Sequence, residues 1–339
     1  MKNILIRTGL NIQMTALLLL FMSPIACAAS HAPSIVRSFD IFWAAAQDKP
    51  FAQQEKLWDE FIEQDREDLY QAVVWEADHH PDWRGRKHRI LQSRFASYSG
   101  LANQIADAAA RLEVDISRQG AKFRTVFADA PESPDAQIIL APNFDAKSGV
   151  LADGSCVLVF AIDSLILEKA NMDVVIPHEL FHLYHANHAG IKNDGVMAGA
   201  DLTLPLFEEG LATYVSTQLS PGYKDEEYLL QEDLGSLQDQ RLPEIARRFL
   251  TDADFLAIDR LHPDAFNRWF NSSTTKVNAD LPNRTGYWLG LAVIRYLRQS
   301  YSLSDIASWR PDQAQMRARE VLTALASSLN QERPLSSNN

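Results

Sequence analysis

The chain contains the stretch Pro177-His178-Glu179-Leu180-Phe181-His182-Leu183-Tyr184-His185-Ala186-Asn187-His188, which holds four of its nine histidines. His178 and His182 stand four residues apart, and Glu179 directly follows the first of them, a spacing written H-E-x-x-H. In a helix, residues i and i+4 lie on one face, so both imidazoles can reach a single ion. Glu179 then lies about 100° further around the helix, which places its carboxylate beside that ion.

Two imidazoles with a neighbouring carboxylate suit zinc chemistry. Zn²⁺ binds neutral imidazole in a tetrahedral shell, and three protein ligands leave the fourth position to water. The pKa of such a water is about 7, and a nearby carboxylate can take its proton as the water attacks a carbonyl carbon. The spacing therefore predicts His178 and His182 as Zn²⁺ ligands and Glu179 as a general base. A third ligand must come from elsewhere in the chain.

One candidate for the third ligand lies in Phe207-Glu208-Glu209-Gly210-Leu211-Ala212-Thr213-Tyr214. This stretch resembles the second active-site helix of the gluzincin metallopeptidases, the group that contains thermolysin and the aminopeptidase-N family. Their third ligand is the Glu of an Asn-Glu-Gly-Phe-Ala-like string, so alignment on Gly210 implies Glu209 as the ligand and Glu208 as its neighbour. Thr213, one helical turn after Glu209, is expected either to orient a ligand by a hydrogen bond or simply to pack.

The other candidate is His188, six residues after His182, the spacing at which metzincin peptidases place their third histidine. In that pattern a glycine three residues after the second ligand lets the helix end, and His185 occupies this position here. We therefore favour Glu209 and keep His188 as the alternative. His185 lies on the same helix face as His178, so it is expected to be either a contact beside the site or a partly exposed residue near the helix end.

Residues 1–29 have the pattern of a signal peptide for secretion. Lys2 and Arg7 are their only charges, and an apolar run over 16–22 is followed by small residues. The pattern predicts cleavage after residue 28 or 29 and a periplasmic or secreted protein. The alternative is lipoprotein processing at Cys27, because Ile25-Ala26-Cys27 partly fits a lipobox, and this would give a membrane-anchored lipoprotein.

The composition is that of a globular protein with a sizeable core, since 46% of the residues are hydrophobic. A formal net charge of −12 argues against nucleic-acid binding, which normally needs a basic patch. Outside the N-terminal run no segment is long and apolar enough for a membrane span of about 20 residues, so we expect no transmembrane span in the mature chain. The two cysteines, Cys27 and Cys156, give no disulfide framework.

The spacing of apolar residues predicts an α+β fold that is mainly α. It is helical over 30–115, and three short β-prone segments follow: Phe123–Phe127, Gln137–Ala141 and Cys156–Ile162. These segments predict a small mixed sheet ahead of the H-E-x-x-H helix. The resemblance implies that an edge strand of this sheet pairs with extended substrate, and Cys156–Ile162 is the candidate.

The predicted catalytic region covers 116–330, and 331–339 reads as a polar tail. Pro177 suits the first turn of the H-E-x-x-H helix, and a second helix over about 206–219 delivers Glu209. A C-terminal helical part then includes an apolar helix that opens after Pro282.

That later helix carries Arg284-Thr285-Gly286-Tyr287-Trp288-Leu289-Gly290. Together with the two earlier motifs, this G-Y-x-x-G string resembles a group of bacterial proteins described as predicted zinc-dependent proteases, over roughly 137–297. Gluzincin peptidases use a donor from a later helix to stabilise the oxyanion of the tetrahedral intermediate. The resemblance therefore implies Tyr287 as that donor, with Arg284 helping to bind the substrate.

The sequence thus predicts a secreted or periplasmic zinc metallopeptidase of gluzincin type that acts on peptides or proteins. The alternatives are a metzincin-like peptidase with His188 as third ligand, or a catalytically silent module that keeps the fold for binding or assembly. Glu179 argues against the silent module, because a structural zinc site needs a fourth protein ligand and no glutamate base.

Overall fold

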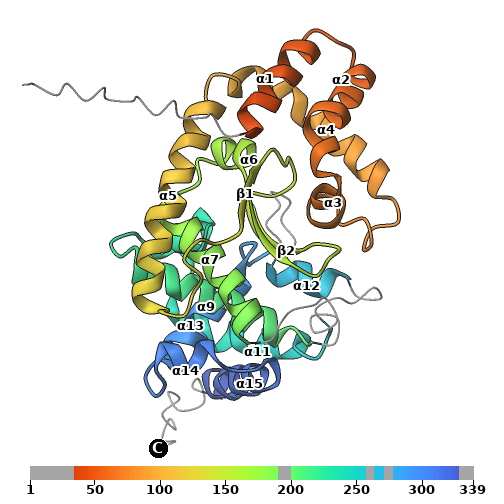
Figure 1. Cartoon of the computed structure of the whole chain (residues 1–339). Helices are drawn as coiled ribbons and strands as arrows, with labels where there is room; N and C mark the ends of the chain where they lie inside the picture. Colours follow the sequence, from red (N-terminus) through yellow and green to blue (C-terminus); the bar gives the residue numbers. More distant parts are fainter. Residues whose placement is uncertain (1–33, 190–199, 257–262, 271–277, 328–339) are drawn as a thin grey trace, which may run out of the picture. The chain divides into compact units, whose positions relative to one another are not determined.

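The computed structural model describes residues 34–189, 200–256, 263–270 and 278–327 (Figure 1). Residues from Ala32 onward form one compact unit. The predicted signal peptide with Cys27 and the predicted tail at 331–339 lie outside the described residues, as do residues 190–199, 257–262 and 271–277.

The first part of the compact unit is helical, as predicted, and its core is aromatic. Phe42 packs edge-on against Trp58 and Tyr98, with ring centroids 5.6 and 6.3 Å apart, and all three side chains are fully buried. Such rings bury a large apolar area per residue. The helical segments are α1 (Ser34–Ala46), α2 (Phe51–Trp58), η1 (Asp59–Glu63), η2 (Gln64–Arg66), α3 (Glu67–Leu69), η3 (Tyr70–Val74), α4 (Trp83–Leu101) and α5 (Ile105–Val126).

The predicted strand Phe123–Phe127 is wrong, because α5 continues through these residues to Val126. Phe123 and Phe127 stand four residues apart, a spacing that fits one face of a helix as well as one face of a strand. Their rings lie 4.7 Å apart, and both also contact Tyr184 of the later helix α7 (Met172–His188). These contacts with α7 therefore explain why the segment is helical.

The described residues form a three-stranded mixed sheet with the order β1-β3-β2. β1 (Ala136–Ile139) pairs parallel with β3 (Cys156–Ala161), and β2 (Ala146–Val150) pairs antiparallel with it. The prediction that Cys156–Ile162 is an edge strand is therefore wrong, since β3 is central. Its buried apolar run is typical of a strand that is covered on both faces. β2 was not predicted, because Lys-Ser-Gly carries no β-branched or aromatic signal.

The sheet lies between the N-terminal helices and α7. α7 packs on β2 and β3, while η3 packs on β2. A Cβ on Gly149 of β2 would lie only 2.7 Å from a methyl carbon of Val73, so this close contact requires glycine. On the same side Asn143 donates a hydrogen bond of 2.7 Å to the backbone carbonyl of Val74. The N-terminal helices are thus part of the sheet's packing.

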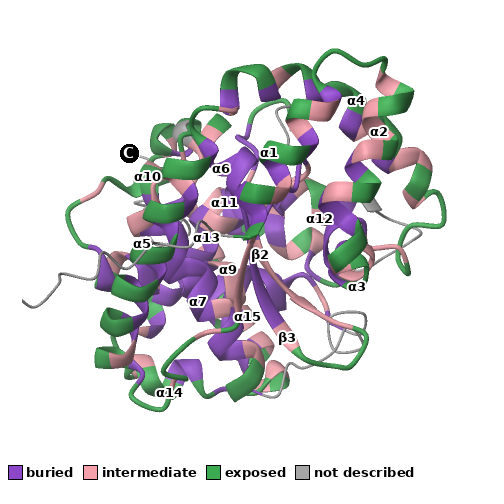
Figure 2. Ribbon diagram, turned by 45° about the horizontal axis from the view of Figure 1, so that its top comes forward, coloured by how far each residue is buried: buried purple, intermediate pink, exposed green. Residues whose placement is uncertain are grey.

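Beyond the sheet the chain is again helical, and its innermost helices carry the candidate site. Figure 2 shows α7 and α9 in the buried interior, whereas α2, α4 and α5 present exposed faces. The helical segments are α6 (Ile162–Leu167), α7 (Met172–His188), α9 (Thr203–Leu219), α10 (Asp225–Tyr228), η4 (Glu232–Ser236), η5 (Asp239–Arg241), α11 (Leu242–Asp252), α12 (Pro263–Phe270), α13 (Thr285–Leu297), α14 (Leu303–Ala307) and α15 (Pro311–Ser327). The predicted fold class, α+β and mainly α, is confirmed.

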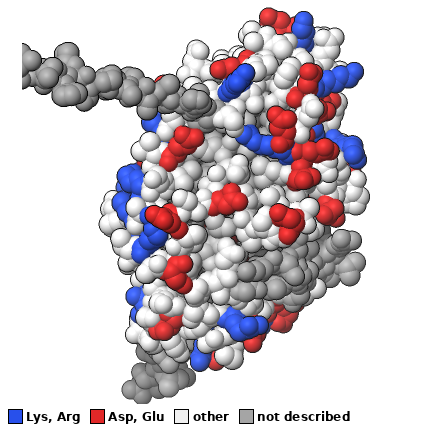
Figure 3. Space-filling model, viewed as in Figure 1, with Lys and Arg blue, Asp and Glu red and all other residues white. Residues whose placement is uncertain are grey.

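Charge is dispersed on the face seen in Figure 3, where Lys and Arg alternate with Asp and Glu among the described residues. None of the helices in the described ranges has the length and apolar character needed to cross a membrane.

Candidate metal centre

The helix α7 begins where its own sequence caps it. Asn171 accepts a hydrogen bond of 3.1 Å from the backbone N–H of Asp173, and the Asp173 carboxylate lies in the first turn, where negative charge is favourable. Pro177 therefore lies inside the helix, and its predicted place in the first turn is wrong. From Val174 to Phe181 every side chain of α7 is buried, so the histidines are held in a packed environment.

His178, His182 and Glu209 come together between α7 and α9. The Nε2 atoms of His178 and His182 lie 3.0 Å apart, and the Glu209 Oε2 lies 3.2 Å from the first and 3.4 Å from the second. Tetrahedral zinc with ligands at 2.0–2.1 Å has neighbouring ligand atoms about 3.3 Å apart. The three atoms therefore form a triangle of the size that a zinc ion needs, and these residues fit the ion.

The charges of the three side chains depend on one another. Burial by itself would raise the pKa of Glu209, but the positive charge of His182 and hydrogen bonds from both histidines hold it well below its usual range. Against its own burial, Glu209 raises the pKa of His182 to about 9, whereas burial lowers the pKa of His178. The raised pKa favours the protonated form of His182, so an ion that bound here would compete with a proton.

Glu179 lies beside the triangle and is only 8% exposed. Burial raises the pKa of Glu179 to about 8, and the charges of Asp145 and Glu209 add to this effect. A carboxyl group with a pKa near neutrality is well suited to accept a proton and to give it back. Asp145 was missed by the sequence analysis, because it precedes β2 in a segment that carries no motif.

Tyr287 and Arg284 continue the site from the start of α13. The ring of Tyr287 stacks on His178 with centroids 6.2 Å apart, and the Arg284 guanidinium lies 5.1 Å from the Tyr287 ring centroid. Burial, followed by the negative charge of Glu209, raises the pKa of the Tyr287 hydroxyl well above its usual value, so it stays protonated and can donate. Arg284 has a φ of 56° and donates a hydrogen bond of 3.1 Å to the carbonyl of Leu230.

A direct contact between two backbones brings Glu209 and Tyr287 to the same place. A Cβ on Gly210 would lie 2.3 Å from the backbone carbon of Gly290, so α9 and α13 touch where both residues are glycine. Glu209 immediately precedes the first glycine, and Tyr287 lies about one turn before the second. This contact gives a physical reason for both glycine motifs.

His188 does not join the triangle. Its Nδ1 lies 3.2 Å from Oδ2 of Asp129, and its ring stacks on Tyr184 with centroids 5.0 Å apart. The Tyr184 hydroxyl donates to the same carboxylate at 3.0 Å. In the structure His188 thus belongs to an Asp–His–Tyr cluster at the end of α7.

The remaining predicted neighbours of the site lie close to it with different roles. His185 is buried and stacks on Phe181, and burial lowers its pKa to about 3, so the predicted partly exposed histidine is wrong. Thr213 is fully buried, and its hydroxyl has no hydrogen-bond partner among the described residues, which favours packing. Burial raises the pKa of Glu208 to about 7, and the charge of His182 opposes this effect.

The candidate metal centre rests on the geometry of its own residues. No family model matches the chain, and neither the curated proteins nor the solved structures contain a match to it.

Proposed function

We propose that the protein is a zinc-dependent peptidase of gluzincin type. The observation that carries this proposal is the triangle of His178, His182 and Glu209, which has the dimensions of a zinc site, with the Glu179 carboxylate beside it. A structural zinc site would have a fourth protein ligand, whereas three ligands with an adjacent base are typical of hydrolytic sites.

The roles of the residues follow from their places. A Zn²⁺ held by the triangle would supply Lewis acidity and an acidic water. Glu179 accepts the proton of the attacking water and passes it to the leaving amine, and a Zn²⁺ beside it would favour its carboxylate form. Tyr287 donates its hydroxyl hydrogen to the oxyanion that develops on the substrate carbonyl.

Among the described residues no strand pairs with the outer edge of β2, and this edge supports an extended substrate in this role. The backbone carbonyl of Asp145 accepts a hydrogen bond of 2.8 Å from the backbone N–H of Ala161. The backbone N–H of Leu151 donates a hydrogen bond of 2.9 Å to the carbonyl of Ser155. In an antiparallel pair the residues alternate, so 145, 147, 149 and 151 face β3 while Ser148 points its N–H and C=O outward. A peptide can pair with this edge, and β2 itself packs on α7, the helix that carries both histidines.

Zinc stoichiometry tests the proposal directly. Elemental analysis of the purified protein should find one equivalent of zinc in the wild type and in His188→Ala, and much less in Glu209→Ala. Zinc lost from His188→Ala but kept in Glu209→Ala would move the third ligand to His188. Absence of zinc from all three proteins would leave the binding or assembly module as the better function.

The same preparations should be incubated with an unfolded protein substrate. Hydrolysis by the wild type that disappears with Glu209→Ala supports the peptidase. One equivalent of zinc without hydrolysis of any unfolded substrate would favour the catalytically silent module.

A further inference from the structure

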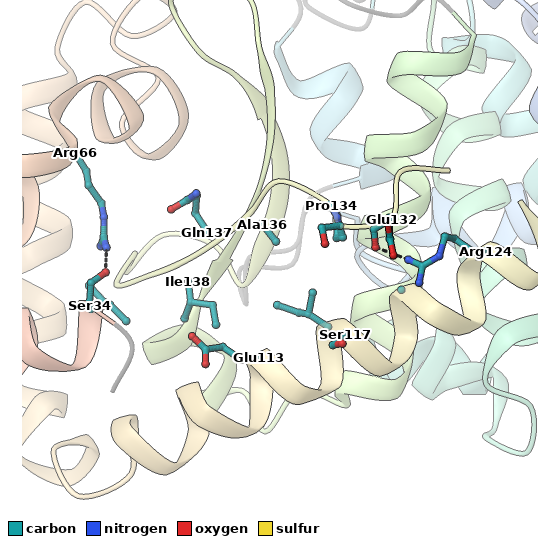
Figure 4. Close-up of a pocket in the computed structure, with 14 residues that line it drawn as sticks. Ser34, Arg66, Glu113, Ser117, Arg124, Glu132, Pro134, Ala136, Gln137 and Ile138 are labelled. Carbon is teal, nitrogen blue, oxygen red and sulfur yellow. Dashed lines mark hydrogen bonds between the residues drawn. The ribbon is translucent and has the colours of Figure 1, made fainter. Parts of the chain in front are cut away.

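A cavity of about 350 Å³ lies between α5 and the outer edge of β1, away from the metal centre (Figure 4). α5 contributes Glu113 and Ile116, β1 contributes Ala136 and Ile138, and Ser34 at the start of α1 closes one end. The candidate metal ligands do not line it. Its volume falls in the range of sites that hold small molecules or short peptide segments.

The backbone of β1 presents unpaired hydrogen-bonding groups to this cavity. The N–H of Leu158 in β3 donates to the carbonyl of Asp135 at 2.8 Å, which fixes the phase of the parallel pair. Residues 135, 137 and 139 then face β3, while Ala136 and Ile138 point their N–H and C=O groups away from it. Tyr70 confirms this phase, because its hydroxyl donates at 2.8 Å to the outward carbonyl of Leu140.

An extended backbone matches this pattern of groups. The outward groups of Ala136 and Ile138 repeat every second residue, about 6.6 Å apart, and each residue offers one donor and one acceptor. Within the described part of the chain these groups have no hydrogen-bond partner, whereas Tyr70 provides one at Leu140. A polypeptide strand satisfies both residues at once through its own alternating N–H and C=O groups.

The charges around the cavity define the side chain that such a strand needs. Glu113 projects toward Ile138 at the middle of the cavity (Figure 4) and forms no ion pair with a described residue. The two arginines stand at opposite ends: Arg66 donates to the Ser34 hydroxyl, and Arg124 donates to the backbone carbonyl of Glu132. A basic side chain opposite Glu113 therefore complements the middle of the cavity.

We propose that β1 binds an extended polypeptide segment as a fourth strand in this cavity, with a lysine or arginine of the segment opposite Glu113. The site lies on the sheet edge opposite β2 and shares no residue with the metal centre. It is an interaction surface for an unfolded or flexible basic segment, and it does not depend on peptidase activity.

Peptide backbone substitution tests strand pairing from the ligand side. The probe is a fluorescein-labelled synthetic peptide that alternates lysine and valine, and its binding to the full chain is followed by fluorescence anisotropy. Two further peptides carry N-methyl groups on the backbone of every second residue. In one peptide the lysines are methylated, and in the other the valines are. A paired strand turns every second N–H group toward β1. We therefore expect one of the two methylated peptides to bind about ten times more weakly than the unmethylated peptide, and the other to bind nearly as tightly.

Protein variants locate the strand on β1. Ile138→Pro removes the outward N–H and keeps the pairing with β3, so binding should fall about tenfold, while Ile138→Val keeps the N–H and the affinity. Glu113→Lys should weaken binding about tenfold as well. Asp40→Lys on α1 makes the same charge change at an exposed site outside the cavity and should leave binding unchanged. Circular dichroism and thermal unfolding establish that each variant is folded.

Several outcomes would overturn the proposal. Equal losses with both methylated peptides would exclude strand pairing, even if Ile138→Pro failed to fold. Equal binding of a peptide with glutamate in place of lysine would exclude recognition by Glu113. Binding that disappears in Glu209→Ala but persists in Ile138→Pro would place the peptide at the metal centre instead.

Discussion

Glu179 can be changed without removing a metal ligand, which separates chemistry from metal binding. In Glu179→Gln the side chain keeps its size but no longer accepts a proton. We expect zinc stoichiometry to stay at the wild-type value and kcat/KM for a peptide substrate to fall by about 10²–10⁴-fold. Zinc analysis and steady-state kinetics on the same preparation measure both. Wild-type kcat/KM in Glu179→Gln would show that Glu179 is not the base.

The hydroxyl of Tyr287 is the other group that can be removed alone. Tyr287→Phe keeps the ring that stacks on His178 and deletes only the donor, so kcat should fall by about 10²-fold with zinc content unchanged. Tyr296→Phe on the same helix is the matched control, because Tyr296 is 44% exposed, and its kcat should stay at the wild-type value. A kcat for Tyr287→Phe equal to that of the control would remove Tyr287 from the mechanism.

The candidate site shows which residues a sequence can predict. His178, Glu179 and His182 follow from local spacing, since one helix sets their directions. Glu209 required a resemblance, because its distance from the histidines depends on how α9 packs against α7. The burial of His185 could not be read from its own helix, because Phe207 of α9 also packs near its ring.

At the scale of elements, the glycine contact between α9 and α13 gives a sharp stability test. Gly210→Ala places a Cβ 2.3 Å from the backbone of Gly290, so the two helices must move apart, and we expect a loss of about 2 kcal/mol or more in the free energy of unfolding. Gly100→Ala near the end of α4 is the matched control. Its Cβ meets nothing within 4 Å, so the change should stabilise by about 0.5–1 kcal/mol. Denaturant unfolding measures both, and equal effects would contradict the close contact.

Asp173 joins α7 to α5 and makes stability depend on pH. A hydrogen bond from Arg118 lowers the pKa of Asp173, and Tyr223 and Gln119 donate to the same carboxylate. A depressed folded-state pKa means that the stabilisation is present above the unfolded pKa of about 3.9 and is lost as the pH falls through the folded value.

Asp173→Asn should therefore reduce the free energy of unfolding by about 1 kcal/mol at pH 7, allowing for partial exposure of the pair. The difference between variant and wild type should shrink as the pH falls below about 4. Urea titrations across this range measure it, and a difference that stays constant with pH would show that the charge of Asp173 is not involved.

The elements also show where sequence patterns fail. The run Phe123–Phe127 is apolar enough for a strand, but its contacts with Tyr184 keep it in α5. The strand β2 has almost no sequence signal and exists because the segment after it returns as β3. The central position of β3 could not be predicted either, because one of its two neighbours is β2, which the sequence pattern does not predict.

At the scale of the whole molecule, α5 passes through residue 115, where the sequence suggested a boundary between regions, and Ala32–Asn339 forms one compact unit. We therefore expect a single cooperative thermal transition. Calorimetry should give equal calorimetric and van't Hoff enthalpies. Two separate transitions would show that the N-terminal helices unfold independently.

Zinc should raise the temperature of this transition, because only the folded chain brings α7 and α9 together. At about 100 times the dissociation constant a ligand stabilises the folded state by about 2.7 kcal/mol, which for a unit of this size corresponds to a rise of roughly 4 °C. EDTA should reverse the rise, and Glu209→Ala should show none. An equal rise in Glu209→Ala would mean that the ion binds elsewhere.

The contact of Gly210 with Gly290 also bears on how firmly Glu209 is held before any ion binds. Two backbones in contact have no rotamers to sample, so the spacing of α9 and α13 is set when the chain folds and needs no adjustment when an ion arrives. The conformational entropy of these helices is then lost during folding and not when an ion binds. An ion that binds there competes with the proton of His182, whose pKa Glu209 raises to about 9 against its burial, so we expect zinc affinity to rise with pH.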